Sequence, residues 1–176
     1  MDAGAGRIIL LNQDSPVNAP VVTTTAESLS YPQSSGAAAV DAQIKVGSMS
    51  STTLAGATVA ISANYASGQD ILAFTNQNGI TGSWNAGTGV LTLSGTASLA
   101  KYQAALRSVT YTDTSDYPTM LPRTVSFVAD DGANLSADAT RTITLTSPYS
   151  LSGTTLTVTG DAGASHHFRG ARHVGG

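Results

Sequence analysis

Short runs in which apolar and polar residues alternate dominate the middle of the chain. From Val40 to Val46 the even-numbered residues are apolar, whereas Asp41, Gln43 and Lys45 are polar. This period of two is typical of a strand with one buried face. Four further runs of this kind are residues 57–61, 90–94, 124–128 and 140–145. We expect a two-sheet β-sandwich whose core includes Val40, Ile44, Val59, Ile61, Leu91, Leu93, Val125, Phe127, Ile143 and Leu145.

One segment, residues 97–109, departs from this alternation. Its apolar residues Leu99, Tyr102, Leu106 and Val109 recur at helical spacing, and its alanines and lysine favour a helix. The sequence therefore predicts an all-β fold with one short helix that crosses between the sheets.

The chain divides into three zones by composition. Residues 1–15 are predicted to be a lead or linker, and residues 16–147 carry the strand-like runs, separated by Gly, Asn, Asp and Pro. Within this body, Asp131 and Gly132 predict a hairpin between the last two runs. Residues 148–176 are predicted to be the strand-like start of a truncated further module, followed by a flexible tail.

Composition and charge argue against three classes of protein: disordered, nucleic-acid-binding and membrane-spanning. Of the 176 residues, 41% are apolar and 11% are charged, and the net charge is −3. This content is too apolar and too weakly charged for a disordered chain. Two lysines and six arginines spread along the chain form no basic stripe, so we expect no nucleic-acid partner. The longest apolar run, Ile8–Leu11, is too short to cross a bilayer, and we expect no membrane insertion.

Six segments, taken in order, resemble the bacterial cadherin-like repeat. They are Ala19–Ala26, Ser67–Phe74, Asn78–Trp84, Gly89–Ala97, Tyr102–Tyr111 and Arg123–Phe127. The resemblance covers about residues 16–147 and implies a Greek-key sandwich of immunoglobulin type. Repeats of this family occur in tandem in large secreted or surface-attached proteins and act in adhesion, spacing or carbohydrate contact. The resemblance thus implies an extracellular or cell-surface location, with neighbouring repeat domains and a glycan or cell-surface protein as partners.

Residues 151–164 resemble the lead-in to a nonapeptide calcium-repeat region, but no Gly-Gly-x-Gly-x-Asp repeat follows them. The N-terminal residues 1–7 also lack the pattern of a secretion signal. Both observations favour a fragment of a longer surface protein.

Residues for catalysis are scarce in the body. All three histidines, His166, His167 and His173, lie in the last dozen residues, so the body cannot supply the base of a Ser-His-Asp triad. Glu27 and seven aspartates are the body's only acids, and the pairs Asp113/Asp116 and Asp130/Asp131 stand in turn-like contexts. We expect a non-catalytic structural or adhesive module.

The aromatic residues leave an alternative open. Trp84 with Tyr65 and the neighbouring Tyr111, Tyr117 and Tyr149 would suit a sugar-stacking surface of a carbohydrate-binding module. A lone tryptophan in a sandwich is, however, also a common core residue.

Calcium is the cofactor that the resemblance raises. The family pattern places a Glu after the first strand and an Asp-x-Asp between the second and third, and neither is present at the matching positions here. The remaining candidate ligands are Asp14, Asp130 and Asp131, because Asp41 is predicted to lie on the polar face of a strand. A useful site needs six to eight oxygen ligands. We therefore expect no cofactor, and calcium binding that is weak at best.

Overall fold

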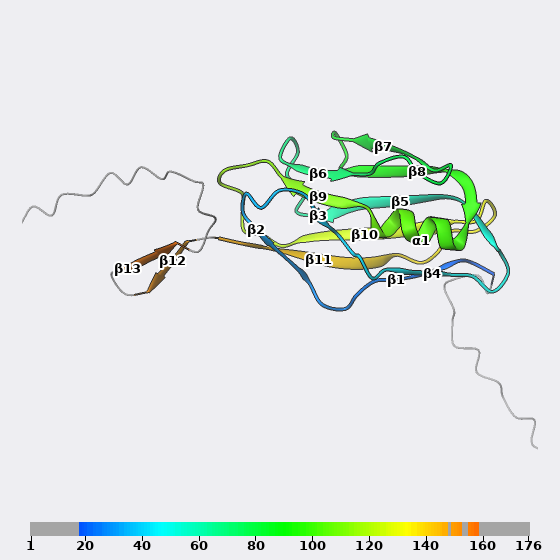
Figure 1. Cartoon of the computed structure of the whole chain (residues 1–176), viewed down its shortest axis with the longest axis horizontal. Helices are drawn as coiled ribbons and strands as arrows, with labels where there is room; N and C mark the ends of the chain where they lie inside the picture. Colours follow the sequence, from blue (N-terminus) through cyan, green and yellow to red (C-terminus); the bar gives the residue numbers. More distant parts are fainter. Residues whose placement is uncertain (1–17, 148, 153–154, 159–176) are drawn as a thin grey trace, which may run out of the picture. The chain divides into compact units, whose positions relative to one another are not determined.

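The computed structural model describes residues 18–147, 149–152 and 155–158. The chain divides into two units, Met1–Thr146 and Ser147–Gly176. The first contains a β-sandwich, called the body below (Figure 1). In the described part of the chain, no helix has the length and apolar character needed to cross a membrane.

The larger layer of the body is a six-stranded sheet with the order β2-β11-β10-β5-β8-β7. Its neighbouring strands pair antiparallel except for β2 and β11, which run parallel. The strands are β2 (Leu29–Pro32), β5 (Thr53–Ala63), β7 (Thr81–Asn85), β8 (Val90–Ser98), β10 (Arg123–Asp130) and β11 (Ala139–Thr146).

The other side of the sandwich is built from smaller sheets and one helix. Three strands form a sheet in the order β3-β9-β6, and two more form the pair β1-β4. The helix connects β8 of the large sheet to β9 of the small one, as the sequence predicts. These elements are β1 (Val21–Thr23), β3 (Ala38–Ala39), β4 (Lys45–Gly47), β6 (Asp70–Ala73), β9 (Thr110–Asp113) and α1 (Leu99–Arg107).

A serine immediately before helix α1 sets the start of the helix. The hydroxyl of Ser98 accepts a hydrogen bond from the backbone N–H of Lys101, so Ser98 is the N-cap. Tyr102 and Leu106 point into the core, and the Tyr102 hydroxyl donates to the carbonyl of Gly95 at 2.6 Å. The predicted helical segment is therefore confirmed, although the helix itself is shorter than residues 97–109.

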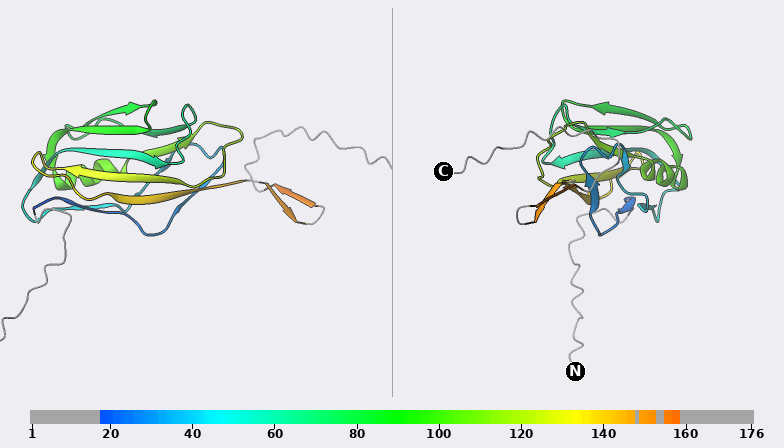
Figure 2. Two further views of the ribbon diagram at one scale, coloured as in Figure 1. Left: turned by 180° about the vertical axis from the view of Figure 1, so that it is seen from behind. Right: turned by 60° about the vertical axis from the view of Figure 1, so that its left-hand side comes forward.

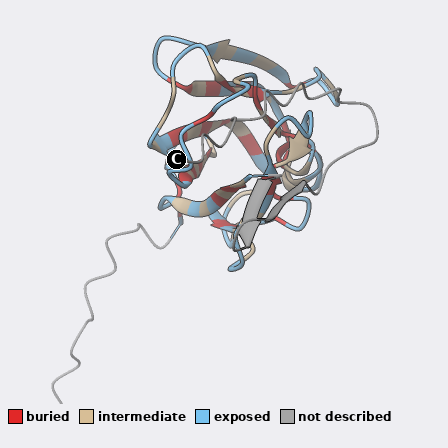
Figure 3. Ribbon diagram, turned by 90° about the vertical axis from the view of Figure 1, so that its left-hand side faces the viewer, coloured by how far each residue is buried: buried red, intermediate tan, exposed pale blue. Residues whose placement is uncertain are grey.

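The core lies between the layers, where the buried segments face inward (Figure 3). All ten residues predicted for it are at most 4% exposed. The predicted all-β sandwich is therefore confirmed. Because apolar and polar residues alternate along each strand, all the apolar side chains lie on one face, and that face is buried.

The predicted strand from Val40 to Val46 is wrong. Only β4, beginning at Lys45, is strand, and Asp41 is buried whereas Ala42 is exposed. Asp41 accepts a hydrogen bond from the backbone N–H of Gln43 at 3.0 Å, which turns the chain. Val40 and Ile44 still reach the core, but from either side of a turn.

The parallel pairing of β2 with β11 has a consequence for the two ends of the body. Ile143 to Thr146 pair in order with Leu29 to Pro32, so the first and last strands of the large sheet run the same way. The body thus begins near Val21 at one end of its long axis and ends at Thr146 at the other (Figures 1 and 2). We call these ends the N-pole and the C-pole.

In the second unit, β12 (Tyr149–Ser152) and β13 (Thr155–Val158) pair as an antiparallel hairpin. The predicted lead of residues 1–15 and the predicted tail, with its three histidines, lie outside the described residues.

Candidate functional site

Tyr65 and Trp84, the two candidate sugar-binding residues, lie together. Trp84 is on β7, the edge strand of the large sheet, and Tyr65 follows β5. Their ring centres are 6.1 Å apart and their planes meet at 83°. Both side chains are half-buried and pack against the core. The edge-to-face arrangement is a favourable aromatic contact, and it offers no pair of parallel ring faces.

The Tyr65 side chain is also tied to the hairpin between β7 and β8. Its hydroxyl donates to the carbonyl of Ala86 at 2.6 Å, and its ring covers Gly89. A Cβ atom at Gly89 would lie 2.9 Å from that ring, and φ there is +70°. Tyr65 thus holds the hairpin in place, which accounts for its position without a ligand. The other tyrosines are elsewhere: Tyr111 is buried, Tyr117 lies on the β9–β10 loop, and Tyr149 belongs to the second unit.

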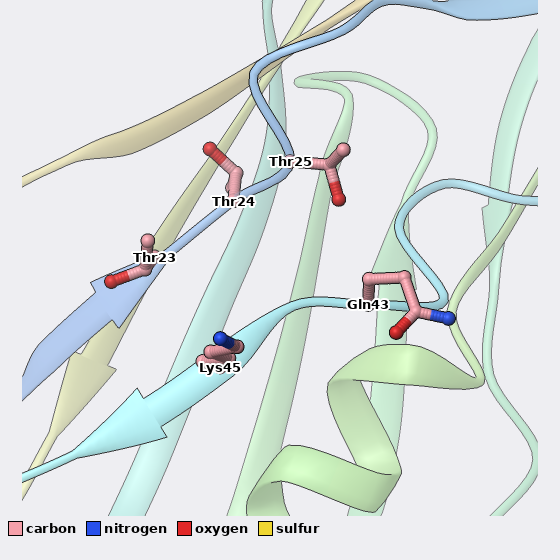
Figure 4. A pocket seen from close by; sticks show the side chains of 5 residues that line it. All are labelled: Thr23, Thr24, Thr25, Gln43 and Lys45. Atoms are coloured by element: carbon pink, nitrogen blue, oxygen red, sulfur yellow. The ribbon is translucent and has the colours of Figure 1, made fainter.

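A shallow hollow of about 320 Å³ opens beside β1 and β4 (Figure 4). It is lined by Thr23, Thr24, Thr25, Gln43 and Lys45. Two of the hydroxyls already have partners, since Thr24 donates to the carbonyl of Thr140 and Thr25 donates to Asp41. Among the lining residues, the side chains of Thr23, Gln43 and Lys45 remain free to contact a ligand.

Three charged side chains lie in the core near the C-pole. The guanidinium of Arg123 is fully buried, and its Nε donates to Oδ2 of Asp70 at 2.9 Å. Its Nη2 lies 3.5 Å from Oδ2 of Asp113. Nη1 donates to the carbonyls of Thr119 and Leu121, which fixes the loop before β10. One buried cation therefore joins two buried carboxylates and a loop.

Tyrosines complete this buried cluster. The Tyr111 hydroxyl donates to Oδ1 of Asp70 at 2.6 Å, and the ring of Tyr31 meets that of Tyr111 edge to face at 4.9 Å. Burial, together with the hydrogen bond to Asp70, raises the pKa of Tyr111 well above its usual range. Burial also raises the pKa of Asp113, and the Asp70 carboxylate adds to this despite the opposing N–H of Ser115 and charge of Arg123.

A third buried carboxylate, Asp41, ties the two layers together. Its Oδ1 lies 2.8 Å from Nη1 of Arg141 on β11, and its Oδ2 accepts the backbone N–H of Thr25 at 2.7 Å. Burial by itself would raise the pKa of Asp41, but the bonds from Thr25, Gln43 and Arg141 together lower it. The predicted position of Asp41 on an exposed polar face is wrong, because these hydrogen bonds and the ion pair hold its carboxylate in the interior.

The sequence analysis did not predict these buried charges, although the alternation pattern of the strands indicates their burial. Arg123 is two and four residues from Val125 and Phe127, so strand alternation places it on their buried face. Asp113 likewise shares a face with Tyr111, and Asp70 shares one with Leu72. The prediction that Asp113 is only a turn residue is incomplete. It does accept the N–H of Ser115, but it is 5% exposed and faces Arg123.

The calcium candidates Asp130 and Asp131 lie next to each other where β10 ends. Oδ1 of Asp130 accepts the N–H of Gly132 at 2.7 Å, and Oδ1 of Asp131 accepts those of Ala133 and Asn134 at 2.9 and 2.7 Å. These bonds lower the pKa of Asp131. No group of three or more His, Cys, Asp or Glu side chains able to hold a metal occurs among the described residues. Asp14 lies outside them.

Comparison with known proteins shows a similarity to a large protein. Over 126 residues the chain is 39% identical to halomucin of Haloquadratum walsbyi (strain DSM 16790 / HBSQ001). The alignment covers 68% of this chain and 1% of halomucin. The chain resembles one short segment of a very long protein. No family model matches the chain, and no solved structure matches it. Halomucin thus supports a modular context, and the structure supplies the fold of the module.

Proposed function

We propose that the body is a non-catalytic spacer module of a large extracellular protein. The observation that carries this proposal is the parallel pairing of β2 with β11, which places the beginning and the end of the body at opposite poles. A domain arranged in this way adds its own length to the polypeptide that contains it. The longest strand, β5, has 11 residues, which corresponds to roughly 35 Å per module.

The similarity to about 1% of halomucin supports the same role, because a segment of this size is a small part of a much longer polypeptide. The cadherin-like resemblance adds tandem neighbours and an adhesive role to the proposal. Its partners are neighbouring repeat domains, with a glycan or a cell-surface protein at the exposed surface. The buried acids are held by arginines and backbone N–H groups, an arrangement that serves stability more directly than chemistry.

Stretching the full chain between its termini in a single-molecule instrument tests the spacer role. We expect the body to unfold in one step that releases roughly 400 Å, since each residue spans at most 3.3–3.6 Å when extended. A matched control attaches the handles at Asn18→Cys and Ala133→Cys, both at the N-pole. Load along the poles strains all the β2–β11 hydrogen bonds at once, so it should require the higher force. Unfolding in several steps, or equal forces in both geometries, would contradict the proposal.

A carbohydrate-binding module is the second candidate, and the half-exposed Trp84 beside Tyr65 is the observation that favours it. A glycan array with the wild-type chain and the Trp84→Ala variant separates the two roles. Specific binding that Trp84→Ala abolishes, while the variant keeps its native fold, would establish this function in place of the spacer role alone.

A further inference from the structure

Large apolar side chains that are exposed on the body gather at its two poles. Among residues 18–147 there are six of them: Val21, Met49, Tyr117, Met120, Leu121 and Leu135. Isolated exposed apolar residues are normal on any protein. Their restriction to the two poles of this body is what requires an explanation.

Strand pairing places three of the six at the N-pole. Met49, which is 97% exposed, lies on the loop that leads into β5, and Leu135 lies on the loop between β10 and β11. Asp130 pairs with Gly56, so these two loops lie at the same end of the sheet. Val21 pairs with Gly47 and therefore lies beside the loop that carries Met49.

The other three belong to the C-pole. Tyr117, Met120 and Leu121 lie on the loop between β9 and β10, and Tyr117 is 90% exposed. Arg123, where β10 begins, pairs with Ile143 close to the end of β11. The hydrogen bonds of the buried Arg123 to the carbonyls of Thr119 and Leu121 hold this loop in its shape. The C-pole surface is thus presented on a fixed loop.

We infer that the poles bind each other head to tail, the C-pole of one copy of this domain against the N-pole of the next. This inference rests on the proposed spacer function. One copy supplies both surfaces, each made of three large apolar side chains, and the poles are where the chain begins and ends. A head-to-tail contact of this kind leaves one pole of each kind free and extends in a line.

The size of the surfaces indicates how strong the contact is. Three side chains at each pole cover less than the 1,200–2,000 Å² of a stable interface. Free copies should therefore bind with a dissociation constant of roughly 0.1–1 mM, and tethered neighbours at about 1 mM effective concentration would be joined about 50–90% of the time. Charge does not drive the contact, because both poles are negative. The N-pole carries Asp130, Asp131 and Asp138 against Lys101, and the C-pole carries Asp116.

Two full-chain variants test the inference by sedimentation velocity from about 10 μM to about 1 mM. One carries Tyr117→Ser, Met120→Ser and Leu121→Ser, and the other carries Met49→Ser and Leu135→Ser. We expect the wild type to self-associate and each variant alone to stay monomeric. An equal mixture should form one-to-one dimers and nothing larger, because each variant retains the pole that the other lacks. A flank control with Ala26→Ser and Thr92→Ser should associate like the wild type, and unchanged melting temperatures show that all the variants fold.

Several results would overturn the inference. The first is a wild-type chain that stays monomeric. The second is a variant that associates as strongly as the wild type by itself, because this result would indicate a symmetric contact between like poles. Salt gives an independent readout: screening the negative poles should strengthen the association, and weakening by salt would contradict an apolar contact. A monomeric chain that still unfolds in one step under force would refute the head-to-tail contact and leave the spacer function standing.

Discussion

Nε of Arg123 lies 2.9 Å from Oδ2 of Asp70, and both side chains are fully excluded from solvent. The pair joins β10 of the large sheet to β6 of the small one, across the core. Asp113 on β9 shares the same guanidinium, and hydrogen bonds from Nη1 anchor the loop of the C-pole. A single arginine thus connects both layers and one pole of the body.

Replacing this arginine should be costly. Arg123→Met keeps much of the side-chain volume but leaves Asp70 and Asp113 in the core without a cation. Removing one partner of a buried ion pair costs about 3–5 kcal/mol. We expect a loss of this size in the free energy of unfolding, measured by urea denaturation. The exposed Lys101→Met is the control and should change stability by less than about 0.5 kcal/mol. Equal effects of the two substitutions would show that the buried pair contributes nothing.

Two of the buried acids, Asp113 and Asp41, should respond to pH in opposite directions. The pKa of Asp113 is raised in the folded state, so its contribution to stability is complete below about pH 4 and is lost as the pH rises through the folded value. The pKa of Asp41 is lowered, so its contribution is present above about pH 4 and is lost as the pH falls through the folded value.

Two variants separate these contributions. Relative to the wild type, Asp113→Asn should gain stability as the pH rises from about 4 toward 7, because the amide cannot ionise. Asp41→Asn should lose stability relative to the wild type as the pH rises to about 4, and the deficit should stay constant above it. Melting temperatures recorded from about pH 2 to about pH 7 cover the titration of both groups and provide the test. Slopes of the same sign for both variants would contradict the assignment.

Gly95 is required by a close approach of two backbone segments. Its φ is +129°, and a Cβ atom there would lie 2.3 Å from the carbonyl oxygen of Gly79. Gly95→Ala should therefore destabilise the protein by about 2–4 kcal/mol. Gly47→Ala is the matched control, since a Cβ at that position meets nothing within 4 Å. Thermal unfolding of both variants measures the difference, and a stable Gly95→Ala protein would show that the two segments separate freely.

Calcium should add little to stability. The carboxylates of Asp130 and Asp131 each accept backbone N–H groups of their own loop, which compete with an ion for the same oxygens. We expect a dissociation constant no tighter than about 10⁻⁴–10⁻³ M. At 1 mM calcium this corresponds to only ~0.4–1.4 kcal/mol. Calorimetric titration of the full chain measures it, and micromolar affinity would reveal ligands outside these residues.

Strand alternation predicted the core because it depends on local order alone. Val125 and Phe127 alternate with Thr124 and Ser126, so their side chains lie on the opposite face of the strand, and this face is the buried one. The same rule failed from Val40 to Val46, where the partner of Asp41 is Arg141, a residue a hundred positions away. No local pattern could indicate that ion pair, and the turn that accompanies it interrupts the strand.

The candidate surface was predictable only in part. The aromatic composition pairs Tyr65 with Trp84, but their edge-to-face contact depends on how β5 and the β7–β8 hairpin meet in space. The apolar poles were not predicted, because Met49, Tyr117 and Leu135 come from loops that are separated in sequence. Their grouping follows from the pairing of β5, β10 and β11, which only the structure gives.

The distance between the poles tests the central claim most directly. The chain has no cysteine, so spin labels at Asn18→Cys and Thr146→Cys report this distance without competing sites. For a body that begins and ends at opposite poles, pulsed electron resonance should give a single distribution centred at roughly 35–45 Å, set by the length of an 11-residue strand and the two labels. A distance below about 20 Å, less than six residues of strand, would place both ends at one pole and contradict the spacer function.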